Sequence, residues 1–153
     1  MKQDIHLGFS GTRQGMTAYQ QAQLRAILWH LAYEGTFPPF VGSEVLIEGR
    51  VADLHHGDCV GSDVEAHDLA SEFRIPCHIH PPDNPKLRAY CTGDVHYKPL
   101  GYRERNEAIV RACTVLIAAP RSLNEQERSG TWMTIRFART DGKPVIVLAP
   151  TKE

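Results

Sequence analysis

Short apolar runs alternate with helical patterns along the chain, and this alternation constrains the fold more than any other feature. The runs are residues 4–9 (DIHLGF), 51–55 (VADLH), 75–80 (IPCHIH), 114–119 (TVLIAA) and 145–149 (VIVLA). Between them lie four segments in which apolar residues recur at helical spacing. Strands that alternate with helices predict an α/β fold, in which right-handed crossovers build a doubly wound, mainly parallel sheet of about five strands.

The first two helices carry sequence signals at their N-termini. Thr17 is followed three residues later by Gln20, and Ser62 by Glu65, a spacing typical of capping boxes. Gly35 is expected to end the first helix. The apolar stripes expected to face the core are Leu24, Ile27, Leu28 and Leu31 in the first helix, and Ala66, Leu69, Ala70 and Phe73 in the second.

Two segments have no clear assignment. Residues 36–50 (TFPPFVGSEVLIEGR) contain two prolines that break any helix, and could form a surface excursion or a small hairpin. Residues 81–100 have the character of a long loop, which in a compact domain is often functional. The third and fourth helices are expected at residues 101–112 and 131–139.

Size and composition indicate one cytoplasmic domain. A chain of 153 residues with 42% hydrophobic and 23% charged residues fits a single domain over residues 1–153. The net charge of −1 gives no general attraction to nucleic acid or to anionic membranes, so neither is an expected partner. No apolar run is long enough for a leader or a membrane span. Four scattered cysteines without a CxxC pair indicate reduced thiols.

Three loops that follow predicted strands and precede predicted helices form the candidate ligand site. They are residues 10–13 (SGTR), 56–62 (HGDCVGS) and 129–131 (SGT). In a parallel sheet the ligand binds beyond the carboxyl ends of the strands, where the strand order reverses. Helix N-termini present free N–H groups, and glycine lets a phosphate or carboxylate approach the backbone. Together the loops predict a cradle for an anion, whereas each one alone could be an ordinary turn.

Four separated blocks resemble the SLOG superfamily of Rossmann-like nucleotide-binding proteins. The blocks are FSGTR (9–13), HHGDCVGSDVEAHDLA (55–70), RERNEAIVRACTVLIAAP (103–120), and SGTWMTIRFA with PVIVL (129–138 and 144–148). That superfamily includes the Lonely Guy phosphoribohydrolases and the DNA-processing protein A fold. The resemblance covers most of the chain except residues 36–50 and 82–98, and it implies a Rossmann-like three-layer sandwich.

The resemblance also implies that residues of the three loops and of the third helix line a nucleotide site. By this resemblance, Gly11, Thr12 and Arg13 would contact phosphate or ribose, and Gly57, Gly61 and Asp63 would form a second wall of the site. Arg105 and Asn106 would face the ligand from the third helix, and Ser129, Gly130 and Thr131 would bind a phosphate. The loop sequences themselves add Ser10, His56 and Asp58 to these candidates, the last as a possible ligand of a ribose hydroxyl.

One departure from the superfamily bears on catalysis. Lonely Guy enzymes carry the motif PGGxGTxxE, whose glutamate is catalytic in cleaving the base from a nucleoside monophosphate. The aligned residues 126–134 are QERSGTWMT, so the Gly-Thr pair is kept and Thr134 replaces the glutamate. Threonine cannot stabilise an oxocarbenium-like centre as a carboxylate does. Base release would need a carboxylate from elsewhere; Asp63 and Glu65 are candidates, and Asp58 and Glu104 are the preferred catalytic residues.

The second loop region also contains residue types that bind metals. They are His55, His56, Asp58, Cys59 and His67, with Cys77, His78 and His80 on the next predicted strand. Zinc needs three or four ligands that converge from recognisable spacings. Adjacent histidines in a continuous strand point to opposite faces, so no metal is predicted here.

Some candidates have an ordinary structural interpretation. His56 could pack at a strand end and bond to the backbone, and Glu65 is expected to cap a helix. Cys59 is expected to be a small buried thiol. By contrast, Arg13 lies between glycines at a strand end, a position that favours binding of an anion. Arg105 lies near a helix N-terminus, where the helix dipole disfavours a cation unless an anion is bound nearby.

These observations predict a protein that binds a nucleotide or nucleotide-derived ligand, of NAD, ADP-ribose or nucleoside-phosphate type, as a sensor or binding protein. The alternative is an enzyme that hydrolyses or transfers at the N-glycosidic bond of a nucleotide, and a third possibility is an interaction protein with no ligand. Superfamily members commonly pair through helices, so the resemblance implies a homodimer, with Trp132 and Ile135 as core or dimer contacts. No additional cofactor is expected.

Overall fold

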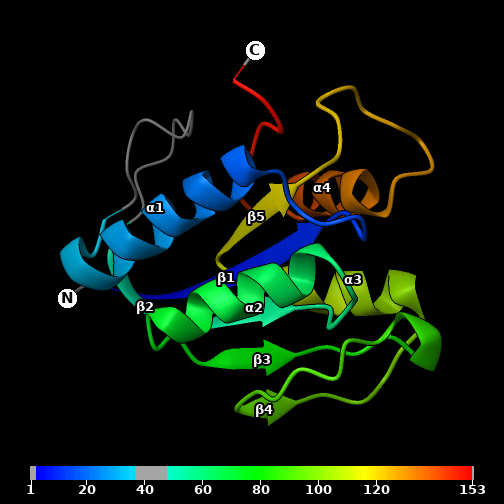
Figure 1. Ribbon diagram of the computed structural model, residues 1–153. Helices are drawn as coiled ribbons and strands as arrows, with labels where there is room; N and C mark the ends of the chain where they lie inside the picture. Colours follow the sequence, from blue (N-terminus) through cyan, green and yellow to red (C-terminus); the bar gives the residue numbers. More distant parts are fainter. Residues whose placement is uncertain (1–2, 37–47, 153) are drawn as a thin grey trace.

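The computed structural model describes residues 3–36 and 48–152, which form one parallel sheet with helices on both faces (Figure 1). The strands are β1 (Gln3–Gly11), β2 (Gly49–His56), β3 (Cys77–Ile79), β4 (Val95–His96), β5 (Val115–Ala119) and β6 (Val145–Val147). The α-helices are α1 (Ala18–Glu34), α2 (Ser62–Glu72), α3 (Tyr102–Ala112) and α4 (Gly130–Thr140). The segment 36–50, for which the sequence analysis made no clear prediction, lies mostly outside the described residues.

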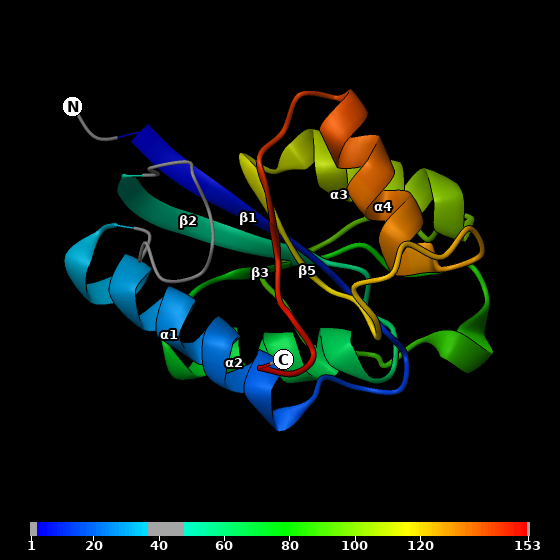
Figure 2. The ribbon, with the colours of Figure 1, turned by 90° about the horizontal axis from the view of Figure 1, so that it is seen from above.

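The sheet has the strand order β4-β3-β2-β1-β5-β6, and every adjacent pair is parallel. Seen from above, α1 and α2 lie on one face and α3 and α4 on the other (Figure 2). The predicted doubly wound, Rossmann-like sandwich is therefore confirmed. The strand order reverses between β1 and β5, which is where such sheets bind their ligands.

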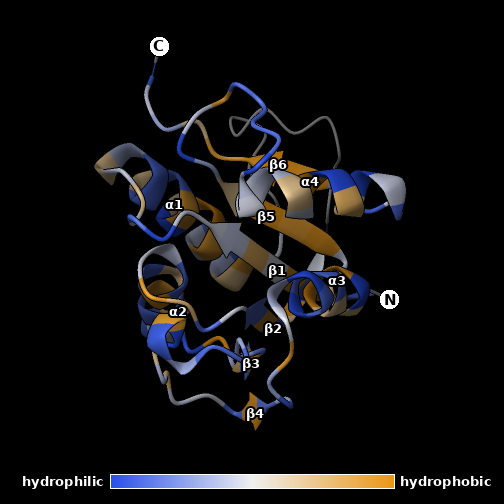
Figure 3. Cartoon of the chain, turned by 90° about the vertical axis from the view of Figure 1, so that its right-hand side faces the viewer, coloured by the Kyte–Doolittle hydropathy of each residue, from blue (hydrophilic) through white to orange (hydrophobic). Residues whose placement is uncertain are grey.

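The main hydrophobic core lies between the sheet and the helices α1 and α2. Alternate residues of β1, Ile5, Leu7 and Phe9, are fully buried there because successive side chains of a strand point to opposite faces. The predicted stripes of α1 and α2 face this core, since Leu24, Ile27, Leu28 and Leu31, and Ala66, Leu69 and Ala70, are buried. In Figure 3, β5 and β6 are hydrophobic, whereas β2 and β3 include hydrophilic residues.

The N-terminus of α1 forms the predicted capping box. The Thr17 side chain accepts a hydrogen bond from the backbone N–H of Gln20, and the Gln20 side chain accepts one from the backbone N–H of Thr17. Gly35 ends the helix in the left-handed conformation, as predicted. The Thr17 hydroxyl also donates to the Pro150 carbonyl and so ties the start of α1 to the C-terminal segment.

The capping box predicted for α2 is wrong. The N-cap residue is Gly61, with a φ of 96° and no side-chain cap, and Ser62 is the first residue of the helix. The Ser62 hydroxyl donates to the carbonyl of Thr12, and the Glu65 carboxylate accepts from the backbone N–H of Met16 at 2.6 Å. Both side chains therefore fasten α2 to the loop after β1, a tertiary contact that the local pattern cannot show.

Residues 81–100 are more structured than the loop that we expected. They contain a short 3₁₀ helix at Pro85–Leu87 and the two-residue strand β4, which brings the sheet to six strands. Val95 of β4 pairs with His78 of β3. A strand of two residues is too short to give a periodic signal. Among the described helices, none is long and apolar enough to cross a membrane.

Candidate functional site

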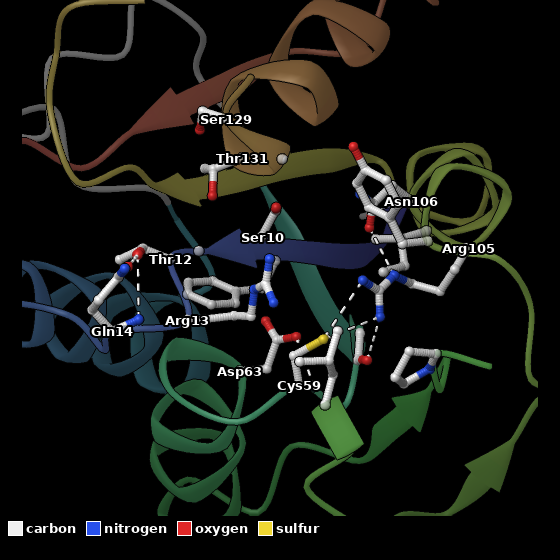
Figure 4. Close-up of a pocket in the computed structure, with 18 of the residues that line it drawn as sticks. Ser10, Thr12, Arg13, Gln14, Cys59, Asp63, Arg105, Asn106, Ser129 and Thr131 are labelled. Carbon is white, nitrogen blue, oxygen red and sulfur yellow. Dashed lines mark hydrogen bonds between the residues drawn. The ribbon is translucent and has the colours of Figure 1, made fainter. Parts of the chain in front are cut away.

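A cavity of about 630 Å³ lies at the carboxyl ends of β1 and β5, where the strand order reverses (Figure 4). Its walls come from the loops after β1, β2, β3 and β5, from α3, and from the starts of α2 and α4. Eleven of the predicted binding residues line it: Ser10, Gly11, Thr12, Arg13, Gly57, Asp63, Arg105, Asn106, Ser129, Gly130 and Thr131. The fold thus brings together loops that are up to about 120 residues apart in the sequence.

The loop after β1 is held against the start of α2. The backbone N–H and the hydroxyl of Ser62 both donate to the Thr12 carbonyl. A Cβ atom at Gly61 would lie 2.2 Å from the Arg13 carbonyl oxygen, and the φ of 96° at Gly61 also favours glycine. Gly61 was expected to let the chain approach a ligand, but it does not line the cavity, and its close contact is with the Arg13 backbone.

Arg105 is a buried cation that faces the pocket from α3. Its guanidinium donates to the carbonyl of Gly57, to that of His80 at 3.4 Å and to the side-chain oxygen of Asn106 at 2.7 Å. These acceptors are neutral, and only 6% of Arg105 is exposed. A buried guanidinium whose hydrogen-bond acceptors are all neutral favours the approach of an anion, although the Asp63 carboxylate lies nearby.

Asp63 is the buried carboxylate of the pocket. It lies in the first turn of α2 and accepts a hydrogen bond from the backbone N–H of Cys59 at 3.1 Å. Burial raises the pKa of Asp63 to about 6, although the Arg105 guanidinium acts in the opposite direction. Asp63 therefore exchanges its proton close to neutral pH.

Positive charge exceeds negative charge along the cavity wall. Arg13, Arg121 and Arg128 are exposed side chains that line the pocket with Arg105, whereas its carboxylates are Asp63 and Asp83. The Arg13 side chain points into the pocket (Figure 4). Four cations from three different segments against two carboxylates favour an anionic ligand.

The N-terminus of α4 forms the wall opposite the β1 loop. The Ser129 hydroxyl caps the helix by accepting from the backbone N–H of Trp132 at 3.2 Å, and Gly130 and Thr131 follow as its first residues. Free N–H groups at this end can bind phosphate. Thr134, at the glutamate position of the Lonely Guy motif, is buried and donates to the Gly130 carbonyl at 2.9 Å.

The structure does not place the two preferred catalytic residues in the pocket. The fully buried Asp58 carboxylate accepts hydrogen bonds from Arg88 at 3.0 Å and from the backbone N–H of Cys91 at 2.8 Å. Glu104 is exposed on the outer side of α3 and does not line the cavity. These positions favour a structural role for Asp58, which anchors the segment after β3, and leave Glu104 without contact to the pocket.

His56 also lies outside the cavity, in the ordinary structural environment considered from the sequence. Its Nδ1 accepts from the Asp58 backbone N–H at 3.0 Å, so its Nε2 carries the ring proton and donates it to His67 Nδ1, which lies 2.9 Å from that nitrogen. Burial lowers the pKa of His56 to about 3. A neutral, fully buried His56 holds the turn after β2 and has no direct path to a ligand.

Cys59 is the small buried thiol that we expected. It lines the cavity, and its Sγ lies 3.6 Å from Arg105 Nη1. Burial raises the pKa of the Cys59 thiol although the guanidinium acts in the opposite direction. The protonated thiol is a weak nucleophile.

Several pocket residues were not among the predicted ones. Pro82, Asp83, Asn84 and Leu87 come from the segment after β3, and Tyr102, Arg121, Gln126 and Arg128 come from α3 and from the loop after β5. Their positions in the sequence could have predicted them, because residues 81–100 and 120–128 directly follow strands. Parallel strands end at the same edge of the sheet, so these segments lie beside the ligand site.

The fold and the pocket define a Rossmann-like α/β protein with a positively charged cavity at the point where the strand order reverses. No protein-family model matches the chain, and no curated protein matches it. Solved structures with the same fold include the molybdenum cofactor binding protein from the phototrophic bacterium Rippkaea orientalis. That match has a TM-score of 0.65 and 21% identity, and covers 95% of this chain and 76% of the other.

Two further structures share the fold. The Moco carrier protein from Chlamydomonas reinhardtii matches with a TM-score of 0.64 and 19% identity over 98% of this chain and 79% of the other. DNA processing protein A from Helicobacter pylori, described in a single-stranded DNA binding mode, matches with a TM-score of 0.58 and 18% identity over 94% and 64%. At identities of 18–21%, these matches confirm the Rossmann-like fold that the resemblance implied.

Proposed function

We propose that this protein binds an organic phosphate of nucleotide type in the cavity between β1 and β5. The phosphate lies between the loop Gly11–Arg13 and the N-terminus of α4. The observation that carries this proposal is the convergence of four arginines and one helix N-terminus on a cavity with two carboxylates. The protein acts as a binding or sensor protein.

The size of the cavity supports a ligand larger than inorganic phosphate. A volume of about 630 Å³ falls within the roughly 300–1,000 Å³ of typical small-molecule sites. Apolar and aromatic residues, Phe9, Leu87, Tyr102 and Ile109, line it alongside the polar ones. Such a lining suits a base, a ribose or a pterin ring attached to the phosphate. Two proteins of the same fold are described as binding or carrying the molybdenum cofactor, so a phosphorylated pterin belongs to the ligand class to be tested.

Thermal unfolding in the presence of candidate ligands tests the proposal. The panel comprises AMP, NAD, ADP-ribose and the molybdenum cofactor, with inorganic phosphate as the control for unspecific anion binding. A ligand at 100 times its Kd stabilises the native state by about 2.7 kcal/mol. We expect at least one organic phosphate to raise the melting temperature more than inorganic phosphate does. Equal behaviour of the whole panel would contradict the proposal.

The enzymatic alternative rests on Asp63. It is the only carboxylate of the four proposed from the sequence that lines the cavity in the described part of the chain, and its raised pKa of about 6 suits proton transfer near neutral pH. Incubation with nucleoside monophosphates, followed by chromatography for free base, tests for hydrolysis. Base release that disappears in Asp63→Asn would favour the enzyme over the binding protein, whereas loss only in Asp58→Asn would point back to Asp58.

Two expectations about partners are also tested in solution. The net charge of −1 argues against nucleic acid as the main ligand, although one protein of the same fold is described with single-stranded DNA. Competition between an oligonucleotide and the ligand found in the panel would test this point. Homodimer formation is tested by sedimentation. Trp132 and Ile135 are buried within the monomer, so a dimer would use other surfaces.

A further inference from the structure

A cluster of histidines surrounds one aspartate on the sheet face opposite the main core. In β2, Asp53 and His55 alternate with the buried Leu54, so both side chains point away from the core. Parallel register places His6 of β1 beside Asp53 and His78 of β3 beside His55. Four positions from three neighbouring strands thus share one patch.

The nitrogen atoms of the cluster converge on the Asp53 carboxylate. His6 Nδ1 lies 2.9 Å and His55 Nε2 lies 3.0 Å from Oδ1, and His78 Nε2 lies 3.5 Å from Oδ2. The donor atoms of His6, Asp53 and His55 all lie within 4.8 Å of one another. The side chains of Asp53 and His55 are 10% and 4% exposed, whereas that of His6 is 41% exposed, so the cluster is open to solvent on one side.

We propose that His6 Nδ1, the Asp53 carboxylate and His55 Nε2 form a binding site for a divalent transition metal ion of the zinc class. Zinc binds imidazole nitrogen and carboxylate oxygen at about 2.0–2.2 Å, which puts tetrahedral donors about 3.3 Å apart. The two nitrogen–oxygen separations of 2.9 and 3.0 Å need only a small expansion to accept the ion, and the two nitrogens lie within 4.8 Å of each other. Three protein ligands and a solvent-facing side leave a fourth position for water or for the nearby His78.

The surrounding side chains hold the proposed ligands in place. His55 Nδ1 lies 2.8 Å from His80 Nε2, and the His80 ring stacks on Tyr97 with centroids 4.3 Å apart. Metal-binding histidines usually engage their second nitrogen in a hydrogen bond, most often to a carboxylate, a carbonyl or water, and here His80 takes that place. Without metal, the Nε2 proton of His55 faces Asp53. When metal binds Nε2, that proton transfers to Nδ1 and is donated to His80, whose own proton moves to its Nδ1. His6 moves its proton from Nδ1 to Nε2, on its exposed side.

This site differs from the pocket and from a second group of potential ligands. None of the three proposed ligands lines the cavity. The second group, His56, His67 and Cys77, lies on the opposite face of the sheet and includes a sulfur donor. The sequence analysis predicted no metal because the adjacent residues His55 and His56 should point to opposite faces of the sheet, and in the structure they do. His55 belongs to the proposed site and His56 to the other group, and the missing ligand His6 comes from a different strand.

Metal binding to tag-free protein tests the proposal. Chelator-treated protein is titrated with Zn²⁺ against a chromophoric competitor, and with Co²⁺ while the absorption spectrum is recorded. We expect one zinc ion per chain and a cobalt spectrum without the intense near-ultraviolet band of a thiolate ligand. His6→Ala, at a half-exposed side chain, should weaken zinc binding at least about ten-fold without unfolding the protein. Asp53→Asn is the second variant and should weaken binding to a similar degree.

His67→Ala is the matched control, since it removes a histidine from the second group alone. It should leave zinc affinity unchanged. Loss of zinc in His67→Ala but not in His6→Ala, or a thiolate band with cobalt, would move the ion to the other face and overturn the proposal. Wild-type zinc affinity no tighter than that of the folded His6→Ala variant would also overturn it, leaving the cluster as a hydrogen-bond network around Asp53.

Discussion

The Arg105 guanidinium occupies the space that a side chain at Gly57 would need. A Cβ atom added at Gly57 would lie 2.5 Å from Arg105 Nη1 and 2.7 Å from its Cζ. The same guanidinium donates to the Gly57 carbonyl, so the glycine provides both the room and the acceptor for the buried cation. The glycine of the second loop therefore shapes the pocket through an arginine that comes from α3, 48 positions later.

Gly57→Ala should displace Arg105 and destabilise the protein. Overpacking of this kind costs about 1–3 kcal/mol, and the displaced cation should also weaken ligand binding. Denaturant unfolding measures the first effect and ligand titration the second. The control for stability is Gly130→Ala, where the nearest atom would be 3.6 Å from the new Cβ and little change is expected. Equal stability of the Gly57→Ala and wild-type proteins would contradict the role given to Arg105.

Arg13→Ala should weaken the binding of an organic phosphate without a loss of stability. The Arg13 side chain is exposed and points into the cavity, so its removal takes away a charge but leaves the packing intact. We expect about a ten-fold increase in Kd, which corresponds to about 1.4 kcal/mol. Calorimetric titration measures this change. Arg139→Ala, which removes an exposed arginine near the other end of α4, should bind like the wild type.

Asp63→Asn should change the pH dependence of stability. The pKa of Asp63 is raised to about 6 in the folded protein from a reference value of 3.8. Between these values the folded state binds more protons than the unfolded state, so the contribution of Asp63 to the free energy of unfolding falls as pH rises. The loss reaches roughly 3 kcal/mol above pH 6. Asparagine does not titrate.

The measurement for Asp63 is the difference in free energy of unfolding between the variant and the wild type, followed from pH 4 to pH 7. It should shift in favour of Asp63→Asn as pH rises, and level off above pH 6. Other titrating groups are common to both proteins and cancel in the difference. A difference that stays constant with pH would show that Asp63 titrates normally.

Asp58→Asn should lower stability and leave the affinity for ligand unchanged. The substitution weakens the acceptor for Arg88 and for the Cys91 backbone N–H in a fully buried position, which should cost about 1–3 kcal/mol. Thermal unfolding and ligand titration of the same variant separate the two effects. Glu104→Gln, at an exposed position, should change neither. Unchanged stability with lost ligand binding in Asp58→Asn would restore Asp58 as a functional residue.

Much of the fold follows from local patterns. Three features depend only on residues within one or two helical turns, and can therefore be predicted from the sequence. They are the periodicity of α1 and α2, the capping box at Thr17 and the end of α1 at Gly35. The alternation of strands and helices also predicts the switch point, and the loops at the strand ends together with the family resemblance named eleven of the residues that line the cavity there. The capping box of α2 failed for the opposite reason, because Ser62 and Glu65 bond to Thr12 and Met16, about 50 residues earlier.

The sequence by itself therefore determined the order of the longer elements, the doubly wound sheet and the edge at which the pocket lies, since these depend on periodicity and on the loops at strand ends. Only the tertiary structure decided which carboxylate reaches the pocket, what holds Arg105, and which histidines meet around Asp53. These outcomes depend on the register between strands and on packing between distant segments. Strand register and long-range packing cannot be predicted from the few residues around Asp58, Asp63 or His6.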